Sequence, residues 1–170
     1  MTGYITDGEG FVHNLKDHGV DIKGKKITVA GGGGAATAIQ VQCALDGARE
    51  ITIFNIKDAF FERTLQTAEK IRKAVPGIVV NVYDIADTAK MTEEITSSDI
   101  FANATIVGMK PMDDQSVVKD LSAFRPGLVV CDAVYNPAET KLLREAKEAG
   151  CTCVGAVSYT HLRAHETSAH

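Results

Sequence analysis

The chain of 170 residues is 45% hydrophobic and 24% charged, a composition typical of a globular protein. Its net charge of -4 supplies no basic surface, which argues against nucleic acid as a partner. No apolar run approaches the roughly 20 residues of a membrane-spanning helix and the amino terminus lacks a signal peptide, so we expect a cytoplasmic protein without a membrane partner.

The first half of the chain alternates helical and strand patterns. A polar start at residues 6–8 precedes a predicted helix with Phe11, Leu15 and Val20 on one side. A β-branched strand over residues 25–30 leads into a glycine turn, a helix that ends near Gly47, and a second strand over residues 50–55. The next helix, over residues 59–75, is stopped by Pro76-Gly77.

The second half continues the alternation. We predict strands over residues 78–83, 99–104, 128–133 and 151–154, and helices over residues 90–97 and 139–149. The segment 107–126 is the least regular, and we expect a loop with a short helix over the carboxyl edge of the sheet. Alternation of this kind predicts an α/β fold, a Rossmann-type doubly wound parallel sheet that forms a dinucleotide-binding domain over residues 1–156.

A glycine motif links the first strand to the helix after it. Gly31-x-Gly33-x-x-Ala36 fits the G-x-G-x-x-G/A pattern, in which the first glycine permits the tight turn and the second lets the backbone approach a pyrophosphate. The positive end of the helix dipole would hold the phosphate charge. A merely flexible turn is the alternative, but the strand before it and the helix after it favour a nucleotide site.

The end of the second strand is expected at the adenosine ribose. It reads Asn55-Ile56-Lys57-Asp58, and an acidic side chain there prefers a free 2′-hydroxyl, whereas a lysine accommodates a 2′-phosphate. Both are present, so the pattern leaves NAD and NADP open, with a preference for NAD or dual use. Asp58 could equally cap the following helix.

Two further strand ends carry small and polar residues where the nicotinamide half should lie. The fourth strand ends in a run that includes Asn103, Thr105 and Ile106. The fifth is followed by Ala133, Val134, Tyr135 and Asn136. A tyrosine at such a position faces the crevice about as often as it packs under a loop. The coincidence of small and polar residues at three strand ends on one edge is stronger support for a cofactor site there.

Metal chemistry is not expected. The four cysteines, Cys43, Cys131, Cys151 and Cys153, lack the paired C-x-x-C spacing of a zinc site and are predicted to be reduced structural thiols. Three of the five histidines fall in the tail, residues 157–170, which resembles translated sequencing-adaptor read-through. We expect that tail to be non-native and exclude it from the fold.

Four motifs in the same order resemble the shikimate dehydrogenase family. They are Thr-Asp-Gly-x-Gly-Phe at residues 6–11, the glycine turn, Asn-Ala-Thr-x-Val-Gly-Met at residues 103–109, and Asp-x-Val-Tyr-Asn-Pro at residues 132–137, followed by Thr-Lys-Leu-Leu at residues 140–143. The match extends over about residues 3–155. Asn-x-x-Asp-x-Phe-Phe at residues 55–61 is most similar to the quinate/shikimate dehydrogenase branch, whose members use NAD as well as NADP.

The resemblance implies an oxidoreductase that passes hydride between a nicotinamide and the carbon bearing the 3-hydroxyl of shikimate or quinate, in a parent that could be a homodimer. A lysine and an aspartate handle the hydroxyl proton, and Asp7 would be that catalytic, substrate-binding aspartate rather than only a helix cap. Tyr135 would also contact substrate. The implied cofactor contacts are Gly31, Gly32, Gly33, Gly34, Ala35, Asn55, Ile56, Lys57, Asp58, Asn103, Thr105, Ile106, Ala133, Val134, Tyr135 and Asn136.

The sequence also departs from the family pattern. The family places a substrate domain, with the catalytic lysine, before the Thr-Asp-Gly segment, and continues beyond residue 154 into a closing segment; neither is found here. Ile5 and Ile56 stand where the family has asparagine and often arginine. We therefore expect a fragment that binds cofactor and is inactive alone. The alternative is a stand-alone, non-catalytic NAD-binding module.

Overall fold

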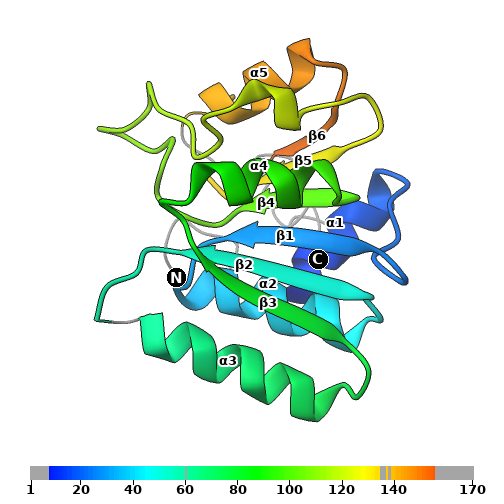
Figure 1. The fold of residues 1–170 in the computed structure, drawn as a ribbon. Helices are drawn as coiled ribbons and strands as arrows, with labels where there is room; N and C mark the ends of the chain where they lie inside the picture. Colours follow the sequence, from blue (N-terminus) through cyan, green and yellow to red (C-terminus); the bar gives the residue numbers. More distant parts are fainter. Residues whose placement is uncertain (1–7, 60, 135–136, 138, 156–170) are drawn as a thin grey trace, which may run out of the picture.

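The computed structural model, which describes residues 8–59, 61–134, 137 and 139–155, is built on one parallel sheet (Figure 1). Its six strands run in the order β3-β2-β1-β4-β5-β6. Their bounds are β1 Lys26–Ala30, β2 Glu50–Asn55, β3 Val79–Asp84, β4 Ile100–Asn103, β5 Val129–Asp132 and β6 Thr152–Gly155. This strand order confirms the Rossmann-type expectation. The chain builds the sheet outward in one direction from β1 to β3 and in the other from β4 to β6, so the switch point lies between β1 and β4, where such folds bind ligands.

Helices cover both faces of the sheet. On one face lie α1 (Gly8–Asp17), α2 (Gly34–Leu45) and α3 (Phe61–Ala74). On the other lie α4 (Thr88–Thr96), the 3-10 turn η1 (Leu121–Ala123) and α5 (Lys141–Glu148). None of the helices in the described part of the chain is long and apolar enough to cross a bilayer.

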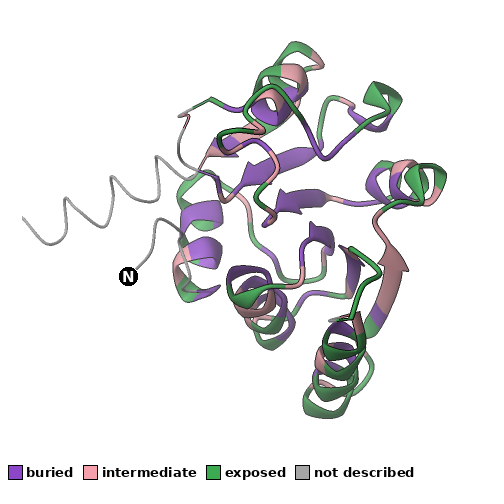
Figure 2. Ribbon diagram, turned by 90° about the vertical axis from the view of Figure 1, so that its left-hand side faces the viewer, coloured by how far each residue is buried: buried purple, intermediate pink, exposed green. Residues whose placement is uncertain are grey.

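The two cores follow from the alternation of side chains along each strand. Ile27 and Val29 of β1 pack with α1, α2 and α3. The next residue, Ala30, points to the opposite face of the sheet and packs with Phe54 on the side of α4 and α5. Figure 2 shows the buried residues gathered on the strands and on the inward sides of the helices. The sheet is thus buried on both faces, as a central parallel sheet requires.

Several helix boundaries differ from the predicted ones because side chains cap the ends. Helix α4 starts two residues earlier than predicted, since Asp87 caps it by accepting the backbone N–H of Lys90 at 3.1 Å. Helix α5 starts two residues later, since Thr140 is its cap. Helix α1 ends at Asp17, and Val20 packs against the core from beyond a turn in which Gly19 has φ 79°.

Candidate functional site

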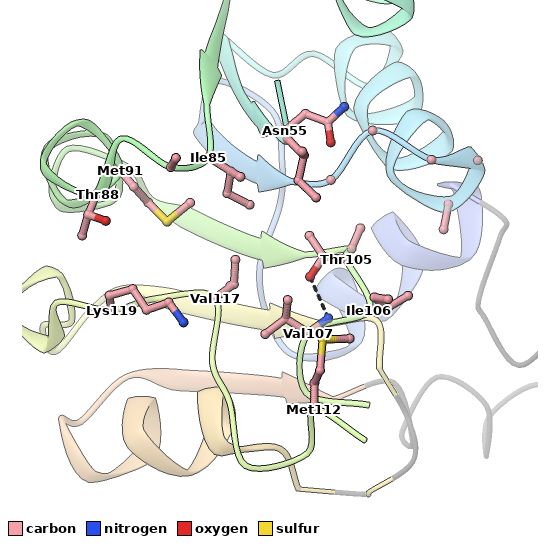
Figure 3. Close-up of a pocket in the computed structure, with 18 residues that line it drawn as sticks. Asn55, Ile85, Thr88, Met91, Thr105, Ile106, Val107, Met112, Val117 and Lys119 are labelled. Carbon is pink, nitrogen blue, oxygen red and sulfur yellow. Dashed lines mark hydrogen bonds between the residues drawn. The ribbon is translucent and has the colours of Figure 1, made fainter. Parts of the chain in front are cut away.

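A cavity of about 740 Å³ opens at the carboxyl edge of the sheet, over the ends of β1, β2, β3 and β4 (Figure 3). This edge carries the connections that follow the strands, so the lining comes from five separate segments of the chain. The lining residues are Gly31, Gly32, Gly33, Gly34, Ala35, Asn55, Ile56, Ile85, Ala86, Thr88, Met91, Ala104, Thr105, Ile106, Val107, Met112, Val117 and Lys119. A volume of this size suits a drug-sized or nucleotide-sized ligand.

The glycine turn is crowded on its inner side and open towards the cavity. Gly31 has φ +126°, and a Cβ on it would lie 2.8 Å from the carbonyl oxygen of Ala104 at the end of β4. A Cβ on Gly32 would lie 2.1 Å from Nδ2 of Asn55. By contrast, a Cβ on Gly33 or Gly34 would meet no heavy atom within 4 Å. The backbone at Gly33 and Gly34 is therefore accessible to a ligand.

Helix α2 begins at this turn and directs its amino terminus to the cavity. Its N-cap is Gly33, which makes no side-chain capping bond, and its first turn carries no acidic side chain. From inside, Nε2 of the buried Gln40 donates to the carbonyl of Gly31 at 3.1 Å and holds the turn in place. Backbone N–H groups and the positive dipole end of such a helix favour an anion.

The end of β2 forms the corner beside the glycine turn. Asn55 lines the cavity, and its Nδ2 donates to Oγ1 of Thr64 on α3 at 2.9 Å. Ile56 also lines the cavity and is 60% exposed. Lys57 and Asp58 are exposed and lie beyond the lining, where the N–H of Phe61 donates to the carbonyl of Asp58 at 3.1 Å. Two of the four predicted ribose residues thus border the cavity directly.

The opposite wall contains residues that the sequence did not single out. Ile85, Ala86, Thr88 and Met91 follow β3, and Met112, Val117 and Lys119 come from the irregular loop between β4 and η1. Lys119 is the one charged side chain among the described residues of the lining. The expected position of this loop, over the carboxyl edge, was the only sequence signal for these residues.

The end of β4 splits into cavity-facing and buried residues. Thr105 and Ile106, two of the predicted cofactor contacts, line the cavity. Asn103 is 1% exposed and lies behind them: its Oδ1 accepts from the backbone N–H of Thr105 at 3.0 Å and from its Oγ1 at 2.6 Å. Its Nδ2 donates to the carbonyl of Val107 at 3.0 Å. The structure therefore places Asn103 as a support of this turn rather than on the cavity surface.

The end of β5 lies next to that support. Ala133 is half-buried and lines a second, small cavity of about 20 Å³ together with Asn103, and Val134 is buried. Neither lines the large cavity. Tyr135, Asn136 and Asp7, the other residues predicted for the nicotinamide and substrate side, lie outside the described residues.

Asp132 is a buried carboxyl group that the sequence interpretation assigned no role. It ends β5, is 2% exposed, and accepts hydrogen bonds from Oγ1 of Thr140 at 2.7 Å, from the N–H of Val134 at 2.9 Å and from Nδ2 of Asn103 at 3.2 Å. Burial raises the pKa of Asp132 to about 6, although these three donors act in the opposite direction. Asp132 and Thr140 both belong to the motifs that carry the family resemblance, but the sequence did not show that their side chains bond to each other.

The four cysteines are free thiols and form no disulfide bonds. Cys43 and Cys131 are buried, which raises the pKa of both thiols. Within the described ranges, no three His, Cys, Asp or Glu side chains are grouped so that they could hold a metal ion.

Known proteins are similar to this chain in sequence and in fold. A quinate/shikimate dehydrogenase of Escherichia coli is 45% identical over 154 residues, which cover 91% of this chain and 53% of that protein. The chain therefore spans about half the length of the curated relative it matches. No protein-family model matches the chain.

Solved structures extend the comparison. A shikimate 5-dehydrogenase of Listeria monocytogenes, solved with shikimate and NAD, is 45% identical with a TM-score of 0.87, and the match covers 92% of this chain and 54% of that one. A shikimate dehydrogenase solved with NADP+ is 28% identical with a TM-score of 0.74, over 91% of this chain and 51% of that one. Both cofactors thus occur among the similar proteins.

Proposed function

We propose that the chain belongs to the shikimate dehydrogenase family over the half of those proteins that it matches, and that it binds NAD or NADP in the cavity described above. One observation carries the proposal. The glycine turn is closed on its inner side by Ala104 and Asn55 but open at Gly33 and Gly34, beside the uncapped start of α2 and a cavity of about 740 Å³. That is the combination a pyrophosphate with an adenosine attached requires.

The residues that line the cavity would bind and position the cofactor but would not react with it. The backbone of Gly33, Gly34 and Ala35 would receive the pyrophosphate, and the apolar wall that includes Ile85 and Met91 would receive the adenosine half. Bound there, the nicotinamide would accept or donate the hydride. The segments after β4 and β5 would orient it and exclude water, which is the part of catalysis that a binding domain supplies.

The complete enzyme would act on shikimate or quinate. The similar Listeria monocytogenes protein was solved with shikimate and NAD, which supports a substrate of this class. We place Asp7 and Tyr135 on the substrate side, with Asp7 hydrogen-bonded to the reacting hydroxyl. Since the chain spans about half of its curated relative, we expect the 170-residue polypeptide to bind cofactor but not to oxidise shikimate or quinate.

Calorimetric titration of the 170-residue protein with NAD and NADP tests the binding proposal, and dehydrogenase assays with shikimate and quinate test the expected inactivity. Heat of binding with no turnover is the expected outcome. Absence of binding to both dinucleotides by protein that is folded by circular dichroism would refute the assignment, and measurable turnover would refute the inactivity.

The choice of dinucleotide can be tested at the corner after β2. We propose that Asp58 prefers the free 2′-hydroxyl of NAD, so Asp58→Ala should weaken NAD binding more than NADP binding. The matched variant Lys57→Ala should weaken NADP more than NAD, because it removes a cation near a 2′-phosphate. If Asp58→Ala changes both affinities equally, Asp58 does not contact the ribose.

A further inference from the structure

Asp132 joins two connections of the sheet edge through a single carboxylate. Its Oδ1 accepts from Nδ2 of Asn103, which ends β4, and from the N–H of Val134, which follows β5. Its Oδ2 accepts from Oγ1 of Thr140, the cap of α5. The carboxylate is 2% exposed, so these three protein donors replace the water that a surface aspartate would have.

The bonds continue from Asp132 to the cavity. Asn103 uses its amide nitrogen for both Asp132 and the carbonyl of Val107, and its amide oxygen for Thr105. Oγ1 of Thr105 accepts in turn from the N–H of Val107 at 3.1 Å, the bond drawn in Figure 3. Thr105 and Val107 line the cavity. The position of the cavity wall therefore depends on the group to which Asn103 donates.

Among the described residues, the groups that bond to the carboxylate are neutral. Asn103 reaches it from β4 and Thr140 from the start of α5, while its register partner on β6 is Gly155. The titratable neighbour on its own strand is Cys131, whose thiol pKa is raised well above its usual value by burial, so it carries no charge near neutral pH. The nearest formal charges along the chain are Arg125 and Glu139, which are opposite in sign.

Resting on the proposed function, we infer that Asp132 is a positioning residue: its ionised carboxylate, through Asn103, holds the turn at 103–107 in the arrangement that receives the nicotinamide half of the dinucleotide. An ionised carboxylate is an acceptor at both oxygens and serves all three donors. A protonated carboxyl carries an O–H of its own, and if this O–H donates to Oγ1 of Thr140, the hydroxyl proton of Thr140 loses the Oδ2 acceptor that it has in the ionised form.

Protonation of Asp132 therefore leaves a buried hydroxyl proton without its acceptor and disfavours this arrangement. Burial raises the pKa of this carboxyl to about 6, so the protonation occurs between about pH 5 and pH 7. If only the ionised form receives the nicotinamide, the competent fraction at pH 5 is roughly a tenth, and the apparent dissociation constant of NAD rises about tenfold between pH 7.5 and pH 5.

The experiment is a series of NAD titrations of the 170-residue protein between pH 5 and pH 8. The wild type should lose about tenfold in affinity towards pH 5, as the competent fraction falls. Asp132→Asn, which keeps the side-chain shape, should bind weakly at every pH with a flat profile. Thr140→Ser should retain the wild-type profile and Thr140→Val should lose it. Asp21→Asn, which removes an exposed carboxylate that accepts from the N–H of Lys23, is the matched control and should change nothing.

A second readout separates this inference from the proposed function. The amide N–H of Val134 donates directly to Asp132, so its proton chemical shift should titrate with a midpoint near pH 6 in the absence of ligand, and not in Asp132→Asn. Titration of this amide without any NAD binding would refute the proposed function. NAD binding with the same pH profile in wild type and Asp132→Asn, or an amide that does not titrate, would overturn the role of Asp132.

Discussion

At the scale of single residues, the four consecutive glycines lie in different environments, which the sequence alone does not distinguish. A Cβ on Gly32 would lie 2.1 Å from Nδ2 of Asn55 and 2.8 Å from Oγ1 of Thr64, so this glycine is required by packing. Gly33 and Gly34 face open space, so nothing in the protein itself requires the absence of a side chain there. What they leave room for is the proposed pyrophosphate.

This difference predicts opposite outcomes for two substitutions. Gly34→Ala should leave the free energy of unfolding within about 0.5 kcal/mol of wild type, as for a surface site, yet weaken NAD binding at least about tenfold by occupying ligand space. Gly32→Ala should destabilise the fold by displacing Asn55. Urea unfolding and calorimetry measure the two effects. Unchanged NAD affinity in folded Gly34→Ala would contradict the phosphate assignment.

Lys119 is a second residue whose place at the cavity becomes visible only in the fold. It lines the cavity on the wall opposite Asn55, away from the corner where the ribose is expected (Figure 3). An ammonium donor there suits an acceptor of the adenine ring rather than a 2′-phosphate.

Lys119→Met should therefore weaken NAD and NADP by the same factor, about three- to tenfold for one hydrogen bond. Lys70→Met, on the exposed side of α3, is the control and should leave both affinities unchanged. Parallel titrations with the two dinucleotides provide the measurement. A loss confined to NADP would instead place Lys119 at the 2′-phosphate.

At the scale of elements, the amino edge of the sheet is held by a buried ionic cluster formed by Lys26, Glu50 and Glu94. Nζ of Lys26, at the start of β1, lies 3.0 Å from Oε1 of Glu94 on α4 and 3.5 Å from Oε2 of Glu50 on β2. Oγ1 of Thr52 also donates to Glu94 at 2.9 Å. The cluster thus ties one helix to two strands at the edge opposite the cavity.

Removal of Lys26 should leave the carboxylates of Glu50 and Glu94 poorly neutralised, with only the more exposed Arg49 at 3.5 Å from Glu50 and Lys90 at 3.9 Å from Glu94. Lys26→Met is expected to cost about 3–5 kcal/mol, and the double variant Lys26→Met with Glu94→Gln should cost less than the single one. Urea unfolding at pH 7 measures both. Glu69→Gln, which removes a solvent-facing pair with Arg72 on α3, is the control for a small effect. NAD affinity of the folded fraction should not change, because the cluster lies at the far edge.

At the scale of the whole molecule, the fold was predictable because many residues report the same pattern. Strand and helix periods alternate along the chain, and right-handed crossovers then leave few topologies. The glycine turn and the ends of β2 and β4, which the sequence indicated as parts of the site, line the cavity. Met112, Val117 and Lys119 were not, because an irregular loop has no period to read. Asn103 could not be assigned to the buried side, because a strand-end asparagine looks the same whether it faces a ligand or ties a turn.

The whole molecule also bears a cost for keeping Asp132 ionised. Its pKa of about 6 lies above the usual 3.8, so the folded state binds the proton more tightly than the unfolded chain. The stability contributed by this group is fully present below about pH 4 and is lost as the pH rises through about 6. Above that pH the buried charge destabilises the fold by about 3 kcal/mol relative to the protonated form.

This sign gives a prediction that opposes the binding profile. On going from pH 7 to pH 4.5, the wild type should gain about 2 kcal/mol of unfolding free energy relative to Asp132→Asn, because only the wild type has this group to protonate. Urea unfolding of the two proteins at both pH values gives the difference, in which the other carboxyl groups cancel. A difference that does not change with pH would mean that Asp132 titrates normally. NAD affinity should fall over the same interval, so the protein would be most stable where it binds cofactor least, as expected when a buried charge is kept for function.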